Sequence, residues 1–194
     1  MNKGRLEAFT DGVFAIVITI MVLEMKVPHS PDAAALLQVL PVFLGYVLSF
    51  VVVGIYWNNH HHMFHAVHRV SGGVLWANLH LLFWLSLMPF VTGWMGENHF
   101  APLPAAVYGV VLLGAACAYF VLTRALLTIH ERESTLARAL GKDFKGKVSV
   151  VIYAAAIPLA FVSAWIACGL YALVAAIWLC PDQRFERLMH EGKA

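Results

Sequence analysis

The chain has 194 residues, of which 61% are hydrophobic and only 12% are charged. A soluble domain carries about 25% charged residues and about 45–50% apolar ones, so this composition indicates a polytopic membrane protein rather than a soluble domain. The formal net charge of +2 is too small to indicate a nucleic-acid-binding protein. The three cysteines lie in apolar runs without metal-ligand spacing, and we expect them to be small buried side chains.

The apolar runs predict an all-α membrane protein, with one domain over residues 1–194 and six transmembrane helices. The predicted spans are residues 6–26, 34–57, 73–94, 104–128, 148–163 and 166–180. The last two come from one apolar block that exceeds the upper limit of about 25 residues for a single span. We divide this block near residues 163–169, and a tight re-entrant hairpin is the alternative.

The basic residues predict the orientation of the chain in the membrane. All but one of the 13 lysine and arginine residues fall on the side of the predicted termini, and the exception is Lys26. Because cytoplasmic loops carry an excess of basic residues, we expect both termini and the loop 130–147 in the cytoplasm. The predicted location is the cell membrane, as a multi-pass protein.

The first span carries an aspartate, Asp11, inside its apolar run. An ionisable group within a membrane helix is costly, and is usually kept for function or for pairing inside a bundle. On a straight helix Asp11 lies about 140° from Ile16, so the two side chains do not share a face. We expect Asp11 to face a neighbouring helix at the cytoplasmic third of the membrane. Candidate partners at that depth are Arg5, Trp57, His60, His61 and Asn78.

A second face of the same span carries an apolar stripe that includes Ile16, Ile20 and Leu23, with Thr19 beside it. This stripe fits a narrow apolar constriction, a lipid-facing surface or an ordinary helix contact. Glu24 follows at the outer end of the span. In an oligomer with this helix at its axis, Glu24 forms a ring of carboxylates at the outer mouth, and otherwise it is a solvated helix end.

A histidine-rich turn follows the second span and contains His60, His61, His62, His65 and His68. One-turn spacing brings His61 and His65 within reach of a shared metal ion, but no cysteine or carboxylate accompanies them. We therefore expect no metal site. A pH-sensing role is a further alternative, since histidine titrates near neutrality.

Three segments resemble the transmembrane protein 175 family, in its bacterial relatives of the lysosomal and endosomal potassium channel. They are Arg5-x-x-x-Phe9-Thr10-Asp11-Gly12-Val13-Phe14-Ala15-Ile16, Trp57-Asn58-Asn59-His60-His61 leading to Phe64, and Leu75-Trp76-Ala77-Asn78-Leu79 followed by Met88-Pro89-Phe90. Thr10 stands where the family has serine, and it keeps the hydroxyl group. These segments cover the first half of the chain, and the second half matches in hydropathy and length only.

The resemblance implies a homotetramer in the lipid bilayer that conducts potassium and other monovalent cations, with the first helix lining the pore and no carbonyl filter. It implies an apolar constriction at Ile16, further layers at Ile20 and Leu23, and a polar ring at Thr19. It also implies a structural network among Arg5, Phe9, Thr10, Asp11, Gly12, Trp57, Asn78 and either His60 or His61. No cofactor is implied beyond the permeant potassium ion.

No phosphate-binding glycine loop and no Ser-His-Asp arrangement occurs in the sequence, and we expect no enzyme activity. Two alternatives to a channel stay open at this point. One is a proton-coupled secondary transporter that uses Asp11 and the histidines as a relay. The other is a non-conducting membrane sensor with a soluble partner for the basic loop 130–147.

Overall fold

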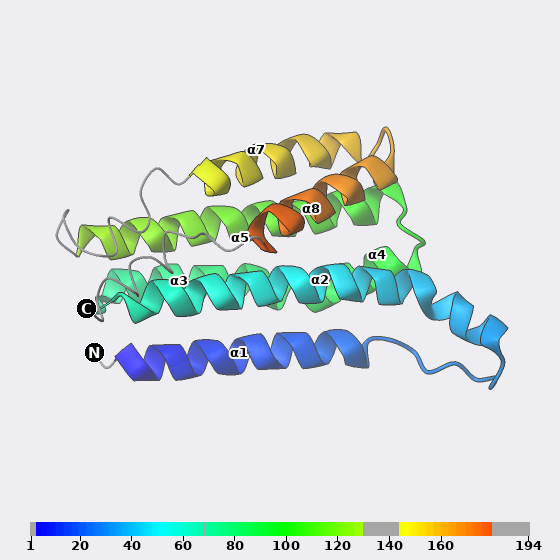
Figure 1. Ribbon diagram of the computed structural model, residues 1–194, viewed down its shortest axis with the longest axis horizontal. Helices are drawn as coiled ribbons and strands as arrows, with labels where there is room; N and C mark the ends of the chain where they lie inside the picture. The colour runs from blue at the N-terminus through cyan, green and yellow to red at the C-terminus, as the bar shows by residue number, and fades with distance from the viewer. Residues whose placement is uncertain (1–2, 68, 130–143, 180–194) are drawn as a thin grey trace.

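The computed structural model describes residues 3–67, 69–129 and 144–179, and all regular structure within them is helical. The helices are α1 (Lys3–Leu23), α2 (Ala33–His65), α3 (Gly72–Ser86), α4 (Met88–Glu97), α5 (Pro102–Thr128), α7 (Phe144–Leu159) and α8 (Ala164–Leu179). They run roughly side by side along the long axis of the molecule, with α1 at one edge and α7 at the other (Figure 1). Helix α1 therefore belongs to the periphery of the subunit.

Helix α2 is longer than predicted, because it continues beyond Trp57 to His65 and includes most of the histidine-rich turn. Pro41 lies inside α2 and removes one backbone donor. The first turns of α2 bend away from the remainder of the helix (Figure 1). Helix α1 ends at Leu23, three residues before the predicted boundary.

The predicted continuous helix over residues 73–94 is wrong at Leu87, where α3 ends and α4 begins. Pro89 supplies no backbone N–H, and it occupies the first turn of α4, where that donor is not needed. Ser71 begins α3 by accepting a hydrogen bond from the backbone N–H of Val74. Residues 72–97 together remain long and apolar enough to cross a membrane.

The last apolar block is divided earlier than predicted, at residues 160–163, between α7 and α8. Each of these helices has 16 residues, which corresponds to about 24 Å of length. That is shorter than the hydrocarbon core of about 30 Å. The helices long and apolar enough to span a membrane, among the described residues, are α1, α2, the α3–α4 pair and α5.

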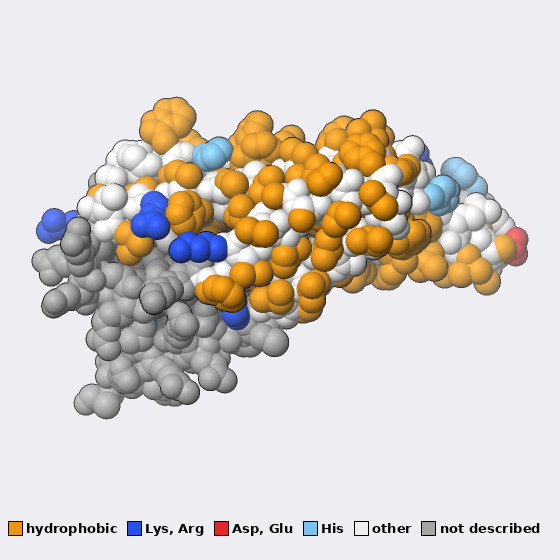
Figure 2. Space-filling view, turned by 90° about the horizontal axis from the view of Figure 1, so that it is seen from above, with side chains coloured by type: hydrophobic (Ala, Val, Ile, Leu, Met, Phe, Trp, Pro, Cys, Tyr) orange, Lys and Arg blue, Asp and Glu red, His pale blue; other side chains and the backbone are white. Residues whose placement is uncertain are grey.

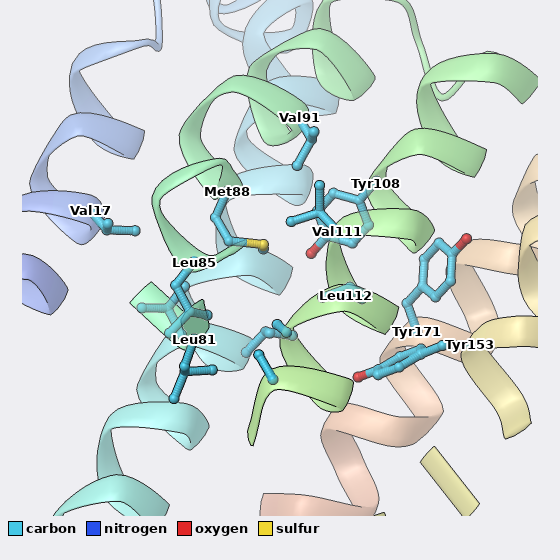
Figure 3. Packing of buried hydrophobic residues seen from close by; sticks show 14 of the residues in the cluster. Val17, Leu81, Leu85, Met88, Val91, Tyr108, Val111, Leu112, Tyr153 and Tyr171 are labelled. Carbon is cyan, nitrogen blue, oxygen red and sulfur yellow. The ribbon is translucent and has the colours of Figure 1, made fainter. Parts of the chain in front are cut away.

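Small residues allow the helices to approach one another closely. A Cβ atom on Gly96 of α4 would lie 2.6 Å from the Cα atom of Val42 in α2, and one on Gly109 of α5 would meet the Tyr171 side chain. Such contacts are typical of helix packing in membranes, where van der Waals contact replaces the hydrophobic effect. Figure 3 shows the Met88 side chain of α4 directed toward the α5 residues Val111 and Tyr108 in the core.

The two ends of the bundle differ in charge. The described basic side chains at the end where α1 begins are Lys3, Arg5, Arg69, Arg124, Lys145 and Lys147. At the opposite end Lys26 forms an ion pair with Glu97, with 2.7 Å between Nζ and Oε1, and this pair ties the α1–α2 loop to α4. The other basic residues of the sequence lie outside the described ranges, so the position of both termini stays a prediction.

Candidate functional site

A buried chain of hydrogen bonds joins α1, α3 and α2. The Asn78 side chain donates from Nδ2 to Oγ1 of Thr10 over 2.9 Å, and Oδ1 of Asn78 lies 2.9 Å from Nε2 of His60. All three side chains are buried. Thr10 reaches this position because α1 buries one narrow stripe, namely Leu6, Thr10, Phe14, Val17 and Met21.

The direction of these bonds defines the protonation of the His60 ring. Oδ1 of Asn78 carries only lone pairs, so Nε2 of His60 must carry the hydrogen. The ring stacks on Phe64 with 4.3 Å between centroids, and Phe14 lies at 6.2 Å on a tilted plane. His60 is therefore held by apolar rings as well as by one amide. Of the two candidate histidines, His60 is the one that joins this network, while His61 is exposed.

Asp11 is bound by a different partner. Its Oδ1 atom accepts a hydrogen bond of 3.0 Å from the indole N–H of Trp57, which ties α1 to α2 at the surface of the subunit. Trp57 also stacks on His61, with ring centroids 6.0 Å apart. The structure thus forms two separate links between α1 and its neighbours, one buried at Thr10 and one exposed at Asp11.

The remaining signature residues of α1 point away from the subunit. Arg5, Phe9 and Gly12 are exposed, and a Cβ atom on Gly12 would meet nothing within 4 Å. These three residues share one face of α1 with the predicted pore residues, and neighbouring members of this face are alternately four and three residues apart. This exposed stripe, which we call the α1 outer stripe, consists of Arg5, Phe9, Gly12, Ile16, Thr19 and Leu23.

The predicted pore residues all lie on the outer side of α1. Ile16 is 58% exposed and Leu23 is 79% exposed in the single chain, and Ile20 is also exposed. The hydroxyl group of Thr19 lies 3.0 Å from the carbonyl oxygens of Ala15 and Ile16, so it donates its hydrogen to its own helix. The lone pairs of the Thr19 oxygen consequently remain available on the exposed side.

Glu24 lies apart from this stripe. It is exposed and packs near Gly93 of α4, where its Cβ atom is 3.9 Å from the position of a Cβ on that glycine. A polar hollow between the α1–α2 loop, the start of α2 and the end of α4 includes Glu24, Lys26 and Glu97. Within the described residues, no group of three or more histidine, cysteine, aspartate or glutamate side chains is arranged to hold a metal ion.

One buried polar cluster was missed by the sequence interpretation. Ser49 of α2 lies 2.6 Å from the Thr92 hydroxyl group of α4 and 3.0 Å from the Tyr108 hydroxyl group of α5. The cluster joins three helices through hydroxyl groups alone. Single hydroxyl residues in apolar runs occur in most membrane helices, so the sequence carries little signal for it.

Comparison with known proteins assigns the chain to a family. A protein named as a potassium channel from Chryseobacterium sp. (strain P1-3) is 52% identical over 192 residues, which cover 99% of this chain and 100% of that protein. The chain belongs to the TMEM175 family. The family model, described as endosomal/lysosomal potassium channel TMEM175, matches residues 5–89, which contain the three signature segments except for the last residue, Phe90.

Other members of the TMEM175 family are similar over most of the chain. A protein named as a potassium channel from Streptomyces collinus is 35% identical, covering 90% of this chain and 91% of that protein. The crystal structure of a lysosomal potassium-selective channel TMEM175 homologue from Chamaesiphon minutus superposes with a TM-score of 0.81 at 31% identity. The superposition covers 91% of this chain and 96% of that one, which confirms the all-α, six-helix fold class.

The human endosomal/lysosomal proton channel TMEM175 shares a shorter segment with this chain. The two are 37% identical over 83 residues, which make up 37% of this chain and 16% of the human protein. The family and its named relatives are channels rather than enzymes. Together with the apolar helices, membership in the TMEM175 family makes this chain a multi-pass membrane protein.

Proposed function

We propose that this protein is a potassium-permeable cation channel of the bacterial cell membrane, formed by four copies with α1 around the central axis. The observation that carries the proposal is the full-length similarity to a protein named as a potassium channel. The number of copies comes from the family resemblance, and the assignment of α1 to the axis is supported by the α1 outer stripe.

The spacing of the α1 outer stripe supports contact between copies of α1. Residues spaced alternately four and three apart follow the repeat of about 3.5 residues with which helices pack along a shared axis. The stripe begins with Arg5, a charged residue that lipid tails disfavour. It contains Gly12, a small residue of the kind that allows helices to approach closely in membranes. A lipid-facing surface has no need of this combination.

The composition of the stripe supports an apolar constriction. Ile16 and Leu23 are one heptad apart, with Ile20 beside them, so a ring of α1 helices places their branched side chains in successive layers. An apolar constriction of this kind gates by dewetting, and passes an ion only when it is wide enough for part of the hydration shell. Between these layers the Thr19 oxygen adds a polar ring with lone pairs for the ion.

The buried Thr10–Asn78–His60 chain and the Asp11–Trp57 bond serve as anchors in this proposal. Both attach the N-terminal half of α1 to α2 and α3. They therefore fix the rotation of α1 about its own axis, and with it the direction in which the α1 outer stripe faces. A rotation error of one residue, about 100°, would replace Ile16 by Ala15 or Val17 in the constriction. Anchoring is therefore a direct requirement of a pore without a carbonyl filter.

The proton-coupled transporter is less well supported than a channel. It requires Asp11 and the histidines in one relay, whereas the partner of Asp11 is Trp57 and the partner of His60 is Asn78. No hydrogen bond of the described residues joins Asp11 to a histidine. The sensor alternative depends on the loop 130–147, most of which lies outside the described residues.

The test is a flux measurement on purified protein in liposomes with an outward potassium gradient and a voltage-sensitive dye. We expect a potassium flux that Ile16→Trp blocks. Val22→Trp is the matched control, since Val22 is also exposed on α1 but lies off the outer stripe. Absence of cation flux at high protein density would overturn the proposal in favour of a sensor. A saturable uptake that requires a proton gradient and is uncoupled by Asp11→Asn would favour the transporter.

A further inference from the structure

A cavity of about 460 Å³ lies between α2, α5, α7 and α8, in the half of the bundle where α1 begins. Its volume falls in the range of about 300–1,000 Å³ that is typical of small-molecule sites. The wall consists mainly of aliphatic and aromatic side chains, among them Ile55, Ala116, Tyr153 and Ala175. Of the three segments that resemble the TMEM175 family, only Asn59 lines it.

The cavity reaches the surface of the bundle between α5 and α7. Cys117, Phe120 and Val121 of α5 and Val151 of α7 line it and are exposed. These exposed side chains are apolar, and they belong to helices of a membrane protein, so the opening faces the lipid rather than water. A hydrocarbon chain enters such an opening without leaving an apolar environment.

Basic side chains surround the cavity at the end of the bundle. Lys147 lines it directly, Arg124 lies 4.9 Å from the ring of the lining residue Phe120, and Lys145 lies 6.0 Å from the ring of the lining residue Trp178. No described lining residue is acidic. Figure 2 shows most of the visible lysine and arginine side chains toward one end of a largely apolar face, while the acidic side chain visible in this view lies at the opposite end.

Two of the polar side chains that line the cavity, Ser149 and Asn59, have partners within the protein. Ser149 accepts a hydrogen bond of 2.9 Å from the Trp178 indole and donates to the carbonyl oxygen of Lys145. The Asn59 amide donates to the carbonyl oxygen of Ile55 over 2.8 Å. The interior therefore offers mainly apolar contact, whereas the rim offers positive charge. This division matches an amphiphile with an anionic head and a hydrocarbon tail.

We propose that the cavity binds one anionic phospholipid of the leaflet at this end of the bundle. One acyl chain occupies the space between α5 and α7, and the phosphate group lies at Lys147 with Arg124 and Lys145 nearby. Long basic side chains at the membrane interface direct their charge toward headgroups, and each contributes to attraction of anionic lipid. No residue of α1 lines the site, so the lipid proposal can be tested independently of the proposed pore.

The test is native mass spectrometry of the purified protein in detergent with equal amounts of phosphatidylglycerol and phosphatidylcholine that carry the same acyl chains. We expect the protein to retain phosphatidylglycerol in preference. Lys147→Gln should lower that preference about fivefold, the factor expected for loss of one basic contact. Arg69→Gln is the matched control, because Arg69 is an exposed basic residue at the same end that does not line the cavity.

A second pair of variants tests the acyl-chain part of the site. Ala116→Phe fills the cavity from within, and Val121→Trp narrows its mouth at an exposed position that leaves the core intact. Both variants should reduce retention of either lipid. If Ala116→Phe fails to fold, the result with Val121→Trp is the test of the acyl-chain part of the site. Equal retention of the two lipids by the natural protein would overturn the proposal. Unchanged phosphatidylglycerol retention in both Lys147→Gln and Val121→Trp would also overturn it.

Discussion

Asn78 of α3 donates a buried hydrogen bond to Thr10 of α1, and the two residues are 68 positions apart in the sequence. The same amide accepts from His60 of α2, so one side chain fixes three helices. A buried amide that serves two partners leaves both of them unsatisfied when it is removed. This makes Asn78 the position at which the attachment of α1 is most sensitive.

The first prediction concerns Asn78→Leu, which keeps approximate size but removes both hydrogen bonds. We expect a loss of about 1–2 kcal/mol in the free energy of unfolding, because buried hydroxyl and imidazole groups lose their partner. The measurement is thermal or denaturant unfolding in detergent. Thr10→Ser is the matched control, since it keeps the hydroxyl that Asn78 requires. Equal stability of Asn78→Leu and the natural protein would contradict the assignment.

The exposed link between Trp57 and Asp11 should be weaker. Trp57→Phe removes the indole donor but retains an aromatic ring, and the lost bond lies at the surface of the subunit rather than in its core. We expect a cost of about 0.5–1 kcal/mol. A double-mutant cycle with Asp11→Ala separates the hydrogen bond from the packing of the ring. Additive effects of the two changes would show that the bond contributes nothing to stability.

Close helix contact leads to a prediction for Gly96. Its Cβ position lies 2.6 Å from a backbone atom of Val42, which a rotamer change cannot relieve. Gly96→Ala should therefore separate α4 from α2 and destabilise the protein by about 1–3 kcal/mol. Gly169→Ala is the control, because α8 is helical there and a Cβ atom meets nothing within 4 Å. That change should be neutral or slightly stabilising, since alanine is the better helix former.

The Lys26–Glu97 ion pair leads to a prediction about pH. The hydrogen bond to Glu97 and the charge of Glu97 raise the pKa of Lys26 above its ordinary value of 10.5. When the pKa of a group is higher in the folded state, its full contribution to stability is present at pH values below the pKa of the unfolded state. That contribution is lost as the pH rises through the pKa of the folded state. Lys26→Gln should thus change the unfolding midpoint by the same small amount at pH 7 and pH 9. A difference that grows between these two pH values would argue against this pair.

The sequence was sufficient for the helical class. Among the candidate partners of Asp11, Trp57 forms the hydrogen bond, whereas Asn78 bonds to Thr10 and His60 instead. The angle between Asp11 and Ile16 predicted that their side chains lie on different faces of the first helix. In the structure Asp11 contacts Trp57 of α2. Whether His60 or His61 joins Asn78 depends on the rotation of α2, which three consecutive histidines leave undefined in the sequence. The geometry selects His60.

Helix breaks were the least predictable part of the fold. Pro89 lies two residues after the interruption at Leu87, but a proline in a membrane span does not by itself predict that the helix is interrupted. The break between α7 and α8 lies at residues 160–163, where no glycine marks it and only Pro158 precedes it. Tertiary contacts decide such boundaries, and they are invisible in the composition of an apolar block.

The last prediction concerns Thr19 in the proposed pore. Its hydrogen is used by the carbonyl oxygens of Ala15 and Ile16, so its oxygen contributes lone pairs rather than a donor on the exposed side of α1. Thr19→Val has the same shape and removes that oxygen, whereas Thr19→Ser keeps it. Because oxygen ligands replace part of the hydration shell of a cation, Thr19→Val should lower conductance and weaken the preference for potassium over sodium. The measurement is the reversal potential in planar bilayers with potassium on one side and sodium on the other. If Thr19→Val and Thr19→Ser both give the reversal potential of the natural protein, Thr19 lies outside the ion path, and the constriction is formed by the aliphatic layers alone.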